Sequence, residues 1–124
     1  MPKALVIDDD KNVRLTMELI LESEGFDVTL ADNVKSALSI TENDDFDILV
    51  VDLVMPELSG IDMVYSFRET NLRTPILMIS GGFKNSEIPQ KQLEGALEEK
   101  PIKMLKKPFT NQEFNDSIKE LLNS

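Results

Sequence analysis

Four parts of the sequence carry side chains that could do chemistry together. In order along the chain they are Asp8–Asp10, Asp52, Ser80 and Lys107. Each follows or ends a short apolar run, which is typical of a buried strand. Carboxylates that hold a metal ion, an aspartate nucleophile, a hydroxyl and a lysine are the parts of a phosphoryl-transfer site.

The elements that position these residues alternate between strands and helices. Apolar runs predict strands at residues 4–7, 26–30, 48–51, 75–79 and 102–105. Helical spacing of apolar residues predicts helices at about residues 12–24, 33–40, 61–71, 88–97 and 110–122. Repeated strand–helix–strand units predict a single α/β domain over residues 1–124, with one five-stranded parallel sheet and helices on both faces. We expect the flavodoxin-like strand order 2-1-3-4-5.

In such a sheet the carboxyl ends of strands one, three, four and five lie along one edge, where open α/β sheets bind their ligands. The carboxylates of Asp8, Asp9 and Asp52 would repel each other there unless a cation neutralises them, and oxygen ligands suit Mg²⁺ or Mn²⁺. Lys107 supplies a positive charge, and Ser80 supplies a hydroxyl donor. Helix capping, a surface lysine and a turn serine would explain these residues one by one. Their coincidence at four strand ends favours a shared site.

Composition limits the classes of function. The 124 residues contain 13 Lys and Arg against 23 Asp and Glu, a net charge of -10 that disfavours direct nucleic-acid binding. The absence of His excludes histidine triads, His metal ligands and phosphohistidine on this chain, and the absence of Cys excludes a disulfide framework. The chain starts with a short apolar strand, too short for a signal peptide or a membrane span, so a cytoplasmic location is expected.

The motifs VIDDD, DLVMPELSG, ILMIS and KKPF resemble, in this order and over the whole chain, those of the response-regulator receiver domain of two-component signalling. The resemblance implies that Asp52 is the phosphoacceptor and one of the residues that bind the metal. It also implies that Asp9 binds Mg²⁺ directly, that Asp8 acts mainly through water, and that the backbone carbonyl of Val54 completes the protein's metal ligands.

The same resemblance implies that Ser80 and Lys107 contact the phosphoryl group from two sides. Pro108 follows a peptide bond that is commonly cis in the family. Ser80 and Met104 occupy the switch positions, where Met104 replaces the usual Tyr or Phe with a flexible side chain that can repack. The segment 81–90 is longer than in commoner members, and its Ser-Gly-Gly start resembles a subgroup that includes stand-alone, chemotaxis-regulator-like receivers.

The resemblance therefore implies a single-domain response regulator, a phosphoprotein of a phosphorelay. It would take a phosphoryl group from a partner histidine kinase or phosphotransfer protein. It would then signal by binding an unidentified protein target or by passing the group onward. Such a protein catalyses its own phosphorylation and dephosphorylation and is not a turnover enzyme.

Two other functions remain open from the residues. A haloacid-dehalogenase-like phosphatase would use Asp8 as nucleophile, with Asp10 completing its D-x-D motif, but Asn12 and Val13 stand where it needs a hydroxyl residue. A flavodoxin-like FMN carrier would bind phosphate after the first strand, where the aspartates repel it. With no Trp and one Tyr, the chain also offers little to stack on a flavin.

Overall fold

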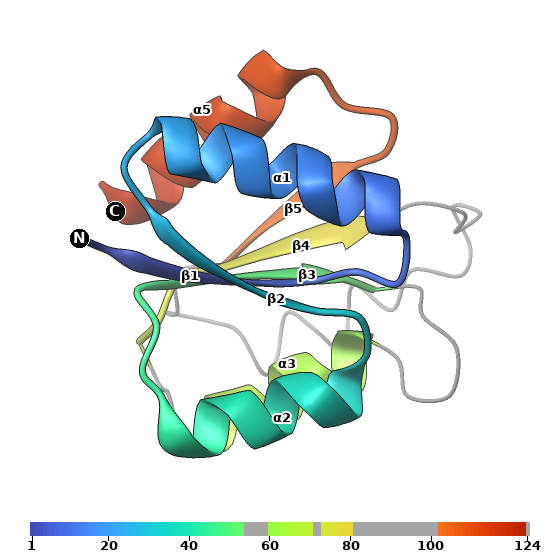
Figure 1. Ribbon diagram of the computed structural model, residues 1–124, viewed down its shortest axis with the longest axis vertical. Helices are drawn as coiled ribbons and strands as arrows, with labels where there is room; N and C mark the ends of the chain where they lie inside the picture. Colours follow the sequence, from blue (N-terminus) through green and yellow to red (C-terminus); the bar gives the residue numbers. More distant parts are fainter. Residues whose placement is uncertain (54–59, 71–72, 81–101, 124) are drawn as a thin grey trace.

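A parallel sheet lies between two layers of helices (Figure 1). The structure, a computed structural model, describes residues 1–53, 60–70, 73–80 and 102–123. The elements are β1 (Lys3–Ile7), α1 (Lys11–Ser23), β2 (Asp27–Ala31), α2 (Val34–Asn43), β3 (Ile48–Asp52), α3 (Gly60–Thr70), β4 (Ile76–Ser80), β5 (Ile102–Lys106) and α5 (Asn111–Leu122). The five strands are parallel in the order β2-β1-β3-β4-β5, which confirms the predicted fold class and topology. The helix predicted at residues 88–97 lies outside the described residues.

The two faces of the sheet have separate apolar cores because successive strand residues point to opposite sides. Helices α1 and α5 cover one face, and α2 and α3 cover the other (Figure 1). The core under α1 and α5 includes Ala4, Val6, Met17, Val50 and Phe114. The core over α2 and α3 includes Leu5, Ile7, Leu49, Val51 and Met63. Among the described residues, none of the helices has both the length and the hydrophobicity to cross a bilayer.

Local capping fixes where the helices begin, and this matters most for α1. The Asp10 side chain accepts hydrogen bonds from the backbone N–H groups of Asn12 and Val13, so Asp10 is the N-cap that the sequence predicts. The helix itself starts at Lys11. Helix α5 begins with a capping box, in which Thr110 and Glu113 bind each other's backbone N–H groups.

Candidate functional site

The residues that the sequence predicts for the site lie together at the carboxyl edge of the sheet. Asp52 is the last residue of β3 and Ser80 the last residue of β4, while Asp8 and Lys107 directly follow β1 and β5. The backbone N–H of Lys107 donates to the carbonyl of Ser80 at 2.8 Å, which extends the pairing of these two strands. Parallel topology thus brings the ends of four strands to one place, as the sequence pattern predicts.

Asp8, Asp9 and Asp52 form an acidic cluster. A carboxylate oxygen from each residue lies within 4.8 Å of the others. Asp8 is 0% and Asp52 3% exposed, whereas Asp9 is open to solvent. Mg²⁺ prefers oxygen ligands and keeps several waters, so two buried carboxylates beside an exposed one fit this ion. The chemistry of these donors therefore supports the predicted metal site.

Lys107 bridges two members of the acidic cluster. Its Nζ lies 3.3 Å from Oδ2 of Asp8 and 3.4 Å from Oδ2 of Asp52. Burial by itself would lower the pKa of Lys107, but the charges and hydrogen bonds of Asp8 and Asp52 outweigh burial and raise this pKa. The ammonium therefore stays protonated at neutral pH and holds a positive charge beside Asp52.

The Asp8 carboxylate has a partner on each of its two oxygens. Its Oδ1 accepts from the backbone N–H of Asp10 at 2.8 Å, and its Oδ2 faces Lys107. Burial raises the pKa of Asp8, and the charge of Asp52 adds to the rise, while the bonds from Asp10 and Lys107 oppose it. The negative charge of Asp8 is thus unfavourable in the metal-free protein, and a bound cation would compensate it.

Ser80 places an unused hydroxyl at the same edge. The residue is 4% exposed, and its buried Oγ has no hydrogen-bond partner in the described part of the chain. Ser80 is the last residue of β4, and the residues after it lie outside the described part of the chain, so its alternative explanation as a turn residue is not tested. A buried hydroxyl without a partner loses stabilisation, so this group can gain a bond when a ligand with acceptor oxygens arrives.

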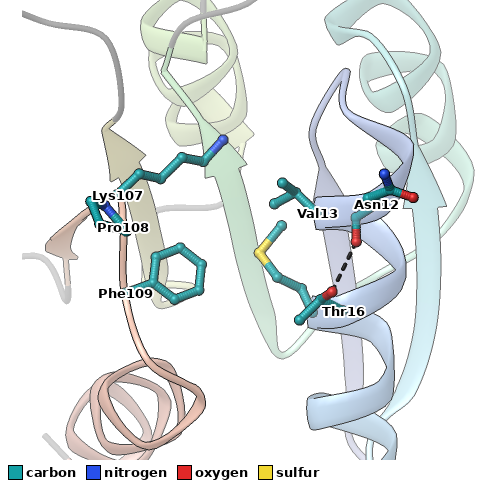
Figure 2. A pocket seen from close by; sticks show the side chains of 7 residues that line it. Asn12, Val13, Thr16, Lys107, Pro108 and Phe109 are labelled. Atoms are coloured by element: carbon teal, nitrogen blue, oxygen red, sulfur yellow. Dashed lines mark hydrogen bonds between the residues drawn. The ribbon is translucent and has the colours of Figure 1, made fainter.

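A pocket of about 540 Å³ opens next to Lys107, between α1 and the chain that enters α5 (Figure 2). It is lined by Asn12, Val13, Thr16, Met17, Lys107, Pro108 and Phe109. The peptide bond between Lys107 and Pro108 is cis, as the resemblance implies. Figure 2 shows the Lys107 side chain extending from this pocket toward the end of β3, where it reaches Asp52.

Val54 and Met104 are two further residues that the resemblance assigns to the site. Val54 lies outside the described residues, so the proposed ligand role of its carbonyl stays a prediction. Met104 lies within β5 opposite Met78, is half-buried, and packs against the core over α2 and α3. Met104 therefore lies in the middle of β5, away from the carboxyl end of the strand. If its side chain repacks, it will move side chains in the core next to α2 and α3.

Two residues at the site were missed from the sequence. Arg14 donates from Nη1 to the carbonyl of Asp8 at 2.7 Å. Gly60 begins α3 and packs so closely on the end of β3 that a Cβ would collide with the backbone of Asp52. A basic residue one helical turn after an acidic run was a usable signal for the first, and the glycine that follows the loop was a usable signal for the second.

The raised pKa of Asp8 leads to a prediction about stability. In EDTA at neutral pH, we expect Asp8→Asn to raise the free energy of unfolding by about 1 kcal/mol. The folded-state pKa of Asp8 lies above its unfolded value, so wild-type stability is fully present below the unfolded pKa and declines as pH rises through the folded pKa. The advantage of the variant should therefore shrink in acid. Urea unfolding followed by circular dichroism measures it.

Saturating Mg²⁺ should reverse this order, because ligand binding to the folded state stabilises wild type more than the variant. Asp10→Asn is the matched control, since Asn caps a helix as well as Asp does. It removes a neighbouring charge and should show neither effect. A lower stability of Asp8→Asn than of wild type in EDTA would contradict the prediction.

Comparisons with known proteins identify the family to which this chain is similar. A model of the response regulator receiver domain matches residues 4–119. The chain is 33% identical over 122 residues to the transcriptional regulatory protein CpxR of Escherichia coli (strain K12), covering 98% of the chain and 50% of CpxR. It is 37% identical over 89 residues to the cell cycle transcriptional regulator CtrA of Caulobacter vibrioides, covering 72% of the chain and 37% of CtrA. The chain thus spans half the length of these relatives, or less.

Solved structures show the same fold over nearly the whole chain. The chemotaxis protein CheY4 of Vibrio cholerae is 27% identical with a TM-score of 0.83, and the alignment covers 98% of this chain and 99% of that one. The receiver domain of the Francisella response regulator 1452 is 30% identical with a TM-score of 0.80, with 99% and 98% covered. Both are similar to this chain in topology and in length.

Proposed function

Because this chain belongs to the response regulator receiver domain family, we propose that Asp52 accepts a phosphoryl group from the phosphohistidine of a histidine kinase or a phosphotransfer protein in the cytoplasm. One observation carries the assignment to this residue. Asp52 is buried at the end of the central strand, within the acidic cluster and 3.4 Å from the Lys107 ammonium. A carboxylate in this position has both the nucleophilic atom and the surrounding charges that phosphoryl transfer needs.

The reaction is an in-line transfer between two residues. A carboxylate oxygen of Asp52 attacks phosphorus and forms the new O–P bond. The P–N bond to the donor histidine breaks, and its electron pair stays on the imidazole, which takes up a proton. Bound Mg²⁺ supplies positive charge for the phosphoryl oxygens. Asp8 and Asp9 would hold it, together with Asp52 and the carbonyl of Val54; Mn²⁺ is an expected substitute.

Lys107 and Ser80 act on the phosphoryl group itself. In the resting protein the Lys107 ammonium balances the charges of Asp8 and Asp52. After transfer it can pair with an oxygen of the phosphoryl group. The Ser80 hydroxyl has no other partner to give up in the described part of the chain, so its bond to a phosphoryl oxygen would be a net gain. A change at Ser80 would act on β5 at Lys106, its partner in the strand register, which is two residues from Met104.

The phosphorylated surface would then act on another protein or pass the group onward, so the partners are a phosphodonor and a protein target. The family match leaves no support for the haloacid-dehalogenase-like alternative. The geometry does not favour it either, because each oxygen of the Asp8 carboxylate already has a partner: Oδ1 accepts from the backbone N–H of Asp10, and Oδ2 pairs with Lys107.

The proposal is tested with the wild-type protein and acetyl phosphate as a small phosphodonor. We expect a phosphoryl adduct in the intact mass with Mg²⁺ present and none in EDTA. Reduction of the acyl phosphate with borohydride, followed by peptide sequencing, should then mark Asp52. A mark on Asp8, or labelling that is equal in EDTA, would refute the proposed site.

A further inference from the structure

Arg14 binds the backbone of the acidic loop between β1 and α1. It lies in the first turn of α1, is half-buried, and donates from Nη1 to the carbonyl of Asp8 at 2.7 Å. This carbonyl belongs to the peptide unit that joins Asp8 to Asp9. The bond therefore acts on the backbone segment that sets the two carboxylates relative to each other.

Other hydrogen bonds hold the rest of this loop, and they involve groups other than the Asp8 carbonyl that Arg14 binds. The backbone N–H of Asp8 donates to Ala31 at 3.2 Å, and Asp10 is tied to Asp8 by a backbone-to-side-chain bond and to α1 as its N-cap. Within the described residues, the hydrogen bond that the Asp8 carbonyl accepts comes from the Arg14 side chain. A planar guanidinium makes a charged hydrogen bond in a fixed direction, so it restricts this unit more than water would.

We propose that Arg14 is a positioning residue for the divalent cation: it holds the peptide between Asp8 and Asp9 so that both carboxylates face the ion. The inference rests on the proposed function of the acidic cluster and adds a residue that touches neither the ion nor the phosphoryl group. Groups that orient metal ligands in this way commonly change metal affinity by about 10- to 100-fold when they are removed.

The sign of the effect separates positioning from simple electrostatics. A cation near the site repels Mg²⁺, so if charge alone mattered, removing Arg14 would tighten Mg²⁺ binding. If Arg14 positions the ligands, its removal weakens binding in spite of the lost repulsion. Lys11 provides the control, because it carries the same charge in the same turn of α1, is exposed, and makes no side-chain hydrogen bond to the acidic loop within the described residues.

The test compares wild type, Arg14→Met and Lys11→Met by Mg²⁺ titration of the resting protein, followed by amide NMR shifts, without any phosphodonor. We expect Mg²⁺ affinity to fall about tenfold in Arg14→Met and to stay equal or rise slightly in Lys11→Met. With acetyl phosphate, the Mg²⁺ concentration for half-maximal labelling should rise in Arg14→Met, while the labelling rate at saturating Mg²⁺ stays close to that of wild type. If Arg14 had a purely structural role, Arg14→Met would lower stability without raising the Mg²⁺ requirement at an unchanged saturated labelling rate.

Unchanged or tighter Mg²⁺ binding in Arg14→Met would overturn the positioning role, and so would equal weakening in Lys11→Met. If Arg14→Met does not fold, Arg14→Gln replaces it, because the Gln amide is too short to reach the Asp8 carbonyl; the same two outcomes then decide. Failure of wild type to bind Mg²⁺ would count against the proposed function itself, so the two ideas fail separately.

Discussion

Replacing Asp52 with asparagine is expected to reduce phosphoryl incorporation from acetyl phosphate at least about a hundredfold, below detection in an intact-mass assay. The amide keeps the shape of the carboxylate but has no nucleophilic anion. The fold should remain intact, because one of three repelling charges in the acidic cluster is removed while Lys107 keeps Asp8 as a partner. Circular dichroism verifies the folded state before labelling is compared.

Asp47→Asn is the matched control for this substitution. Asp47 directly precedes β3, at the opposite end of the strand from Asp52, and its carboxylate accepts from the backbone N–H of Lys3 at 2.7 Å. The change removes the same charge at a distance from the cluster, so labelling should equal that of wild type. Equal labelling of Asp52→Asn and wild type would show that the acceptor is another residue.

Replacing Gly60 with alanine is expected to lower the free energy of unfolding by about 3 kcal/mol. A Cβ at this position would collide with the Asp52 carbonyl oxygen and would stand 2.7 Å from the Asp52 carbonyl carbon and from Cα of Leu53. These are backbone atoms, so no side-chain rotation relieves the overlap. The start of α3 must then move away from the end of β3. Urea unfolding measures the loss.

The same substitution should slow labelling of the folded protein at least about tenfold, because small displacements of a reacting group have large effects on rate. Gly25→Ala is the control. Gly25 has a φ of 93°, and a Cβ added there would meet no atom within 4 Å, so alanine should reduce stability by about 1–2 kcal/mol through backbone strain alone. Its labelling rate, corrected for the folded fraction, should match wild type. Wild-type stability and rate in Gly60→Ala would show that α3 adjusts freely.

Much of the fold could be predicted because its signals are local. Apolar runs and helical spacing identified the five strands, and the alternation of strands with helices indicated a parallel sheet with order 2-1-3-4-5. Capping at Asp10 is equally local, since the side chain binds N–H groups two and three residues away. Boundaries moved by one to three residues: β4 starts at Ile76 and leaves Pro75 outside the strand, and α2 continues to Asn43 instead of ending at residue 40.

The residues that lie together at this edge could also be predicted, because a parallel sheet places the carboxyl ends of its strands next to each other. Asp8, Asp52 and Lys107 are far apart in sequence, yet each lies at the end of a strand of one parallel sheet. Once the strand order is known, their meeting follows from the architecture. The motifs led to the same residues by resemblance, and the family match agrees with that resemblance over residues 4–119.

By itself, then, the sequence determined which residues gather at the carboxyl edge, because periodicity and strand ends are properties of short stretches of chain. Only the tertiary structure decided how they are held. The bond from Arg14 to the Asp8 carbonyl, the contact of Gly60 with β3 and the unpaired Oγ of Ser80 within the described residues depend on distances between atoms of different segments. A one-dimensional pattern indicates which face a side chain lies on, but such distances arise only when the layers pack.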